Sequence, residues 1–493
     1  MGCKRPSIIK NKYISTFIGS FTVYLGIGFI LPINNFAVYI TSYIHLNQEF
    51  VTMHYGMFLN LIFMFAMSSS SSLGGILENR IGFYGTTMLG MAIVFVGNIF
   101  FFNQQNIWLC YFIALIMGIG TGISTSLIGK NLTLFRPNSK GIINGIIGLI
   151  TILCSAIFAV VGEKIIVFNG YTLKEDEEYY PEEIAKRTYL YYLLGLIFLP
   201  IGALLTLLFI YEYKKEYDQN INNSENELKK EEEKKEDTND INQEEKGNNL
   251  LEDESGKVNK ETIKKHIKQV IKKIRFWRIS SISFLINFSL SFMVNTGRTF
   301  GAIIGIDGSA LQFLMVFQAI ALIIIGPILG ILVDKKGPLF ILRIVSIVSI
   351  IPGILLTFFM DVTFVFILSF LIDILGTVAT MVSQGPFIME VYGIQESVIL
   401  GGIISAFTKI SDIITTVTAF GVSFIYTKEE LKFPYRILYI TSSICCILSV
   451  FLLFMESNEK FKYEDSPLEQ NLTVINKKLI QKNNFLEYII INY

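Results

Sequence analysis

GILENRIGF, at residues Gly75–Phe83, returns as GILVDKKGP at residues Gly330–Pro338. Both stretches fit the pattern G-x-L-x-[D/N]-[R/K]-x-G, and each follows the second apolar run of its half of the chain. A charged loop of this kind is ordinary between two hydrophobic helices. Its return at the same place in a second half is instead typical of an internal repeat. The sequence therefore predicts two halves built on one plan.

About twelve apolar runs surround these loops, six on each side of a polar central segment. Most are near the ~20 residues that a helix needs to cross roughly 30 Å of hydrocarbon. The predicted fold class is thus an all-α integral membrane protein with about twelve transmembrane helices in two six-helix bundles. The runs are Ser15–Ile40, Tyr55–Leu77, Gly85–Phe102, Ile107–Ile128, Gly141–Val161, Tyr189–Ile210, Ile279–Val294, Ser309–Val333, Leu339–Phe359, Val362–Ile388, Ile399–Ile425 and Ile437–Phe454.

Lys and Arg are concentrated in the N-terminal segment, in the loops after the second, fourth and eighth runs and in the central segment. Because cytoplasmic loops of membrane proteins are rich in Lys and Arg, these parts and both termini are predicted to be cytoplasmic. The loop Glu163–Arg187 on the opposite side is acidic, although the loop after the eleventh run is basic. Tyr213–Lys260 is too polar to bury a core and is predicted to be disordered. Lys264–Trp277 has helical spacing, and its basic face fits either an anionic leaflet or solvent. The expected divisions are a cytoplasmic N-terminus at 1–14, a first bundle at 15–212, a cytoplasmic, largely disordered linker at 213–275, a second bundle at 276–455 and a cytoplasmic tail at 456–493.

Composition excludes several classes of protein. The 493 residues are 52% hydrophobic with a mean hydropathy of +0.52, higher than the polar surface of a soluble domain allows. The five cysteines and three histidines lack the spacing of a disulfide framework or a metal site. No nucleophile–base constellation is visible, and no basic patch indicates nucleic acid. We expect a monomer in the lipid bilayer of the plasma membrane or an organelle, with no catalytic residue, metal or cofactor.

The repeated pattern resembles motif A of the major facilitator superfamily, whose six-span halves are parallel repeats. The resemblance spans nearly all of the chain except the central segment and the tail. It implies the major facilitator fold and a cytoplasmic gate in which the acidic and basic residues of the motif join neighbouring helices. The first copy has asparagine where aspartate is usual, although Glu78 is adjacent. The implied gate residues are Gly75, Asn79, Arg80 and Gly82, with Gly330, Asp334, Lys335 and Gly337 in the second copy.

Two further stretches carry a narrower resemblance. LFRPNSKGIINGIIG, Leu134–Gly148, is similar to the segment entering span five of oxalate/formate antiporters and monocarboxylate carriers. GIISAFTKISD, Gly402–Asp412, resembles span eleven of the oxalate/formate group, where a lysine neutralises the substrate carboxylate; that lysine aligns with Lys409. The group's span-eight arginine is missing here, and the nearest arginine, Arg298, is either a gate or entry residue or a surface residue. One cationic ligand fits a monoanion better than a dianion.

Lys409 and Asp412 also stand out on physical grounds, because a charge at the centre of a spanning helix costs roughly 2.5–3.5 kcal/mol. Such a charge is tolerated when it faces a partner, a cavity or a substrate. Asp412 follows by three residues on the same helix face, and Asp373 lies near the middle of the tenth run. Either carboxyl group, paired with Lys409, is a candidate to exchange a proton as substrate binds. The alternative is a static ion pair with no transport role.

The sequence therefore predicts a secondary carrier of a small organic anion, of monocarboxylate type, coupled to a proton or a counter-anion by symport or exchange. Asn34, Asn35, Ser383 and Gln384 are expected either to bind substrate or to join helices. Two alternatives stay open. One is a carrier of the same fold for an amino acid, a sugar or a drug. The other is a non-transporting receptor or scaffold that binds cytosolic partners through the central segment.

Overall fold

The computed structural model contains helices joined by turns and loops over the residues it describes, and no strand occurs among them. The first half contains α1 (Lys12–Ile27), α2 (Ile33–His45), α3 (Met53–Phe101), α4 (Ile107–Phe135), α5 (Lys140–Ile166), α6 (Glu182–Lys186) and α7 (Thr188–Phe209). The second half contains α10 (Ile274–Ile303), α11 (Gly308–Lys336), α12 (Pro338–Val348), α13 (Ile350–Phe359), α14 (Thr363–Tyr392), α15 (Ser397–Ile425) and α16 (Lys432–Phe454). The described residues are 12–51, 53–101, 104–167, 179–211, 265–303, 308–394, 396–425, 430 and 432–457.

Both copies of the repeated motif contain a glycine that turns the chain. Gly82 has φ 76° and divides α3 into two helices, and Gly337 has φ 86° and separates α11 from α12. Positive φ is strained for residues with a Cβ atom, so glycine is the residue of choice at both turns. The two glycines occupy the same position of the repeat, and the backbone therefore repeats as the sequence does.

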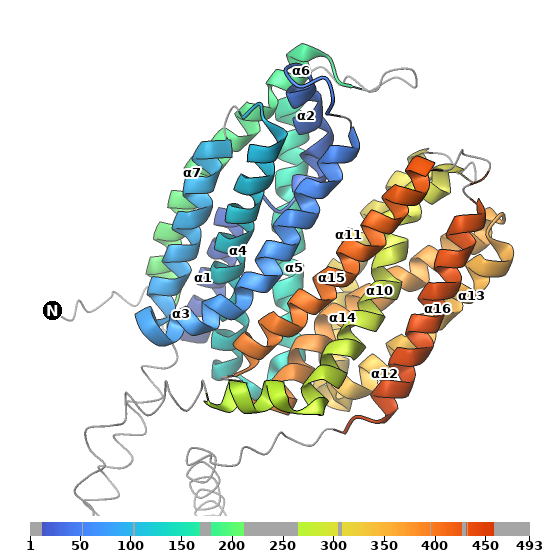
Figure 1. Ribbon diagram of the computed structural model, residues 1–493. Coiled ribbons are helices and arrows are strands. Elements are labelled where there is room, and N and C mark those ends of the chain that lie inside the picture. Colours follow the sequence, from blue (N-terminus) through green and yellow to red (C-terminus); the bar gives the residue numbers. More distant parts are fainter. Residues whose placement is uncertain are drawn as a thin grey trace, which may run out of the picture.

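The helices form two bundles, with α1–α7 in one and α10–α16 in the other (Figure 1). Buried apolar side chains of the first bundle make one large cluster that includes Phe36 and Tyr191. The second bundle has several smaller clusters, one of them around Phe366 and Tyr435. Many large apolar side chains remain exposed on the outside, such as Phe364 at 72%. An apolar exterior of this kind suits a lipid environment.

The two bundles touch near the end that carries Gly82 and Gly337, which we call the motif end. There α5 packs on α11, and α3 packs on α15. A Cβ atom on Gly141 would lie 2.4 Å from the Gly330 carbonyl oxygen, and one on Gly402 would lie 2.3 Å from the Ser72 nitrogen. Small residues therefore let the backbones approach closely across the interface. Figure 1 shows the bundles converging toward this end and separating toward the end that carries α2 and α6.

Eight helical stretches of the described chain are long and apolar enough to cross a membrane, and one of them, Phe58–Phe101, contains two expected spans on either side of Gly82. The expected first span, Ser15–Ile40, is divided into α1 and α2. Pro32 lacks a backbone N–H and disfavours helix in the residue before it, which accounts for the break. The seventh span is longer than expected, because α10 continues beyond Val294. The multi-pass helical architecture is thus confirmed, whereas the count of about twelve spans stays a prediction.

The chain is also helical over residues 265–272, just before α10, and this short helix lies across the motif end (Figure 1). Val270 is fully buried against the second bundle, with Ile267 and Ile271 packed beside it. Lys268 and Lys272 are exposed. The apolar side of the helix therefore contacts protein. Most of the predicted linker, including Tyr213–Lys260, lies outside the described residues, as do residues 1–11 and the tail from residue 458.

Candidate functional site

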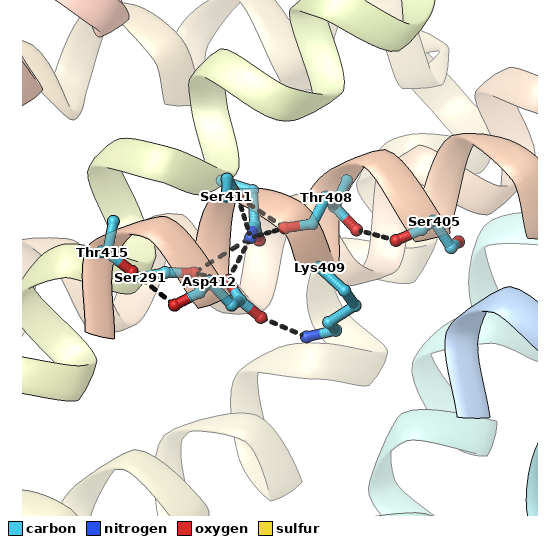
Figure 2. Close-up of polar contacts among 8 residues, drawn as sticks. Ser291, Ser405, Thr408, Lys409, Ser411, Asp412 and Thr415 are labelled. Carbon is cyan, nitrogen blue, oxygen red and sulfur yellow. Dashed lines mark hydrogen bonds and ion pairs between the residues drawn. The ribbon is translucent and has the colours of Figure 1, made fainter. Parts of the chain in front are cut away.

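Lys409 and Asp412 form an ion pair on α15. Lys409 Nζ lies 2.6 Å from Asp412 Oδ2, and the side chains are 21% and 13% exposed (Figure 2). The spacing of three residues places both groups on one side of the helix, as the sequence predicts. Lys409 therefore has a partner in this structure, and a ligand of its ammonium group must either share that group with Asp412 or displace it.

The other oxygen of Asp412 is bound by α10. Asn287 Nδ2 donates a hydrogen bond to Asp412 Oδ1 at 2.5 Å, and Ser291 Oγ donates to the same oxygen. Asn287 Nδ2 also lies 2.9 Å from the Thr408 carbonyl oxygen and 3.0 Å from Ser411 Oγ. Asp412 thus keeps two hydrogen-bond donors even when Lys409 leaves it. The two groups are therefore held unequally: the Asp412 carboxylate has three hydrogen-bond partners, and the Lys409 ammonium group has one.

Sequence reasoning did not identify Asn287 and Ser291. They are four residues apart in an apolar run, so they lie on the same face of the helix. Two polar residues on one face of an apolar helix indicate a polar contact on that face. What the sequence does not reveal is that this face of α10 packs on α15.

Lys409 lies on the side of α15 that faces the first bundle. Val398 and Gly402 on α15 contact Gly75 and Ser72 on α3. Lys409 follows Gly402 by seven residues, which is about two helical turns and returns to the same face. The Lys409 Cα atom is therefore about 10 Å along α15 from that of Gly402, on the side away from the motif end.

Several hydroxyl groups lie along α15 near the pair (Figure 2). Thr408 donates to the Ser405 carbonyl oxygen at 2.6 Å, Ser411 to the Thr408 carbonyl oxygen at 2.5 Å, and Thr415 to the Asp412 carbonyl oxygen at 2.9 Å. Their protons are used within the helix, whereas their oxygen lone pairs remain able to accept hydrogen bonds. The site therefore combines one cation with several acceptors.

Asp373 lies elsewhere, inside the second bundle. Its side chain is 4% exposed and sits on α14 near Tyr439 and Cys446 of α16. Asp373 Oδ1 has no hydrogen-bond partner in the described structure, and Asp373 makes no ion pair with Lys409 there. The structure thus separates the two carboxyl groups that the sequence offers as partners of Lys409, and it pairs only Asp412.

The remaining predicted polar residues fall into two groups. Ser383 is buried and donates to the Ala379 carbonyl oxygen of its own helix, and Gln384 Nε2 is buried without a partner among the described residues. The side chains of Asn34, Asn35 and Arg298 lie outside the described part. Their predicted roles therefore rest on sequence alone.

The second motif copy joins the two bundles through its acid. Asp334, on α11, accepts hydrogen bonds from the backbone nitrogens of Gly141 at 2.7 Å and Ile142 at 3.0 Å, at the start of α5. A carboxylate at a helix N-terminus binds free N–H groups and meets the positive end of the helix dipole. Lys335 is exposed and makes no ion pair in the described structure. The acid of this copy therefore bonds to backbone rather than to a base.

The first motif copy is arranged differently. Asn79 makes no side-chain hydrogen bond in the described structure, and Arg80 is exposed. Glu78 instead pairs with Lys130 of α4, with 2.7 Å between Oε2 and Nζ, and both side chains are almost fully buried. The acidic residue that forms an ion pair in this copy is thus Glu78, which precedes the expected position, and its partner Lys130 belongs to the same bundle. Among the residues described, no group of His, Cys, Asp and Glu side chains is arranged to hold a metal ion.

Residues 16–416 match the family model described as Major Facilitator Superfamily. Because the match covers most of the sequence, the chain belongs to this superfamily of membrane transporters, which are not enzymes. Among curated protein sequences, none matches significantly.

Solved structures with the same fold include three transporters. The human organic anion transporter MFSD10 (TETRAN) is 14% identical with a TM-score of 0.55, and the match covers 90% of this chain and 98% of that one. The proton:xylose symporter XylE is 12% identical with a TM-score of 0.60, covering 90% and 94%. FucP in the outward conformation is 13% identical with a TM-score of 0.55, covering 89% and 99%. At these identities the likeness concerns the fold alone.

Proposed function

We propose that this protein is a secondary carrier of a small organic anion, of monocarboxylate type, that works by proton symport or anion exchange with alternating access. The observation that carries the proposal is the position of Lys409, a cation inside the membrane on the side of α15 that faces the other bundle. Ionisable groups inside a membrane are expensive, and they are functional by default. A single ammonium group favours a ligand with one negative charge.

The way Asp412 is held makes an exchange of partners plausible in energetic terms. Removing one partner of a buried ion pair ordinarily costs about 3–5 kcal/mol, because the other charge is left alone. Here an arriving carboxylate replaces Asp412 at Lys409, and Asp412 retains Asn287 and Ser291 as donors. Neither charge is stranded during the exchange. In a symporter, Asp412 would take up a proton as Lys409 leaves it and release it when the pair reforms.

Asp373 is the second candidate for the coupling proton. It is buried and has one carboxyl oxygen without a partner among the described residues. A lone carboxyl group inside the membrane is well suited to gain or lose a proton as its surroundings change. We assign Asn34, Asn35, Ser383, Gln384 and Arg298 as further candidates for substrate contact, and we place the two motif copies at a cytoplasmic gate.

The deciding experiment compares Lys409→Ala with Lys432→Ala in proteoliposomes. Lys432 forms an exposed ion pair with Asp361 at 2.5 Å and serves as the matched control. Lys409→Ala should abolish uptake and counterflow of labelled monocarboxylates such as formate or lactate, whereas Lys432→Ala should transport at the parental rate. Parental uptake by Lys409→Ala would refute the assignment. Counterflow of amino acids, sugars or drugs instead would identify a different solute, and no counterflow of any solute would favour a receptor.

A further inference from the structure

Several buried polar atoms of the second bundle have no hydrogen-bond partner among the described residues, and four of them lie on α14. They are Ser369 Oγ, Asp373 Oδ1, Thr380 Oγ1 and Gln384 Nε2. These residues follow one another at intervals of four, seven and four, so all of them lie on one face of the helix. We call these four residues the α14 stripe. It extends for about 22 Å along the helix, at a rise of 1.5 Å per residue.

The unpaired hydroxyl groups distinguish the α14 stripe from the residues around it. Serine and threonine in a helix can donate to a carbonyl oxygen one turn earlier. Thr377 does so to the Asp373 carbonyl oxygen at 2.9 Å, and Ser443 on α16 does so to the Tyr439 carbonyl oxygen at 3.0 Å. A buried polar atom without a hydrogen bond is costly, and internal water molecules typically bind such atoms in native proteins. The α14 stripe is therefore suited to hold water.

Ser349 adds a hydroxyl group from the facing segment, at the break between α12 and α13. It is 1% exposed, and its hydroxyl has no partner in the described part of the chain. A Cβ atom on Gly376 would lie 3.0 Å from Ser349 Oγ, so this hydroxyl contacts α14 between Asp373 and Thr380. Pro352 accounts for the break, because it has no N–H to donate to the carbonyl oxygen four residues earlier. Ser349 therefore shortens the gap between two members of the α14 stripe.

Asp373 lies toward the closed end of the α14 stripe. Beyond it, away from the motif end, Ser369 is followed by an apolar cluster that contains Phe366. The other titratable side chains near Asp373 are Tyr439 and Cys446 of α16, both of which are buried. Asp373 makes no ion pair among the described residues. Hydroxyl groups and water are thus what is available to stabilise its charge.

The other end of the α14 stripe reaches the contact between the bundles. Gln384 is next to Gly385, where a Cβ atom would lie 2.3 Å from Asn144 Nδ2 of α5. The α5 helix belongs to the first bundle and packs on α14 here. The α14 stripe therefore leads from a carboxyl group inside the second bundle to a surface that the first bundle covers.

We propose that the α14 stripe and Ser349 hold a file of water molecules that carries the coupling proton between Asp373 and the contact between the bundles. The proton leaves the Asp373 carboxyl group, passes between water molecules and hydroxyl groups, and reaches bulk water when α5 separates from α14. Asp373 is then a carboxylate that the water file solvates. The role of this proton in coupling rests on the proposed function, whereas the water file itself does not.

The first test measures proton exchange at Asp373 without any transport. In the infrared spectrum, the C=O band of its protonated carboxyl group is the band that Asp373→Asn removes, and this band shifts in D2O as the proton exchanges. Thr380→Val keeps the shape of the side chain and should slow the exchange about tenfold, a change in rate comparable to the loss of one hydrogen bond. Ser349→Ala should slow it as well. Thr377→Val is the matched control and should exchange at the parental rate, because the Thr377 hydroxyl is used within the helix.

The second test connects the water file to transport. In proteoliposomes, Thr380→Val should slow uptake driven by a pH gradient and leave counterflow, which moves no net proton, at the parental rate. The proposal is overturned if Thr380→Val and Ser349→Ala both exchange at the parental rate, or if Thr377→Val slows exchange as much as Thr380→Val. It is also overturned if Asp373→Asn removes no carboxyl band at any pH at which the protein is folded. Exchange that depends on the α14 stripe in a protein without proton-linked uptake would support the water file and refute the proposed coupling.

Discussion

Replacing Lys409 and Asp412 together separates a role in binding from a role in stability. The Lys409 ammonium group makes a hydrogen bond or ion pair with Asp412 alone among the described side chains, whereas the Asp412 carboxylate binds Lys409, Asn287 and Ser291. A hydrogen bond to a charged group is worth ~1.5–3 kcal/mol. Lys409→Met should therefore lower the free energy of unfolding by about that amount, and Asp412→Leu, which strands the ammonium, by about 3–5 kcal/mol. The double variant should lose less than Asp412→Leu alone, because no charge is stranded.

The assay pairs apparent melting temperature in detergent with uptake of labelled formate and lactate in proteoliposomes. The double variant should melt above Asp412→Leu and yet transport nothing, because the cation that binds the anion is gone. Lys409→Met should melt below the parent, in keeping with the loss of ~1.5–3 kcal/mol, and should also fail to transport. If the double variant instead takes up either anion at the parental rate, the pair is a structural bridge, and the reasoning from Lys409 to a carboxylate substrate is wrong.

Four further substitutions test other parts of the structure. Gly82→Ala should lower stability by about 1–2 kcal/mol through backbone strain alone, measured by melting temperature, because no atom lies within 4 Å of the added Cβ. Gly141→Val should prevent closure of the motif end and raise cysteine accessibility on α11, since its Cβ would lie 2.4 Å from a carbonyl oxygen. Asn287→Leu should lower stability by ~1.5–3 kcal/mol and slow turnover. Burial raises the pKa of Glu396 above the ordinary 4.5, so the folded state holds this proton more tightly. Stability should then fall as pH rises from about 4.5 toward the raised pKa, and Glu396→Gln should flatten that part of the melting curve.

The features that the sequence predicted well are those set by local chemistry. Gly82 and Gly337 turn the chain because only glycine adopts their positive φ without strain. Aligning the two copies of the motif already shows that these glycines are equivalent. The pairing of Lys409 with Asp412 follows from a spacing of three residues on one helix. The break in the first expected span was not predicted, although Pro32 is a local signal for it.

The features that escaped prediction depend on packing between distant segments. Asn287 reaches Asp412 because α10 lies beside α15, across more than a hundred residues of chain. Glu78 rather than Asn79 forms an ion pair because helix geometry points Glu78 toward Lys130 of α4. Asp334 was expected to work with a basic residue, yet the nearest free donors are the backbone N–H groups that begin α5. Spacing along the chain contains no information about which of these surfaces meet.

The gate and the site share one helix, and this arrangement connects their energetics. Val398 and Gly402 at one end of α15 form the seam with α3, and Lys409 lies two turns farther along the same face. The matching seam at α5 and α11 has a carboxylate bound to two backbone N–H groups, whereas the α15 seam relies on small residues. The α15 seam should therefore separate first. Movement of α15 would then move Lys409 with it. An anion that binds Lys409 more tightly in one position of α15 would therefore shift the equilibrium of the helix that opens the gate.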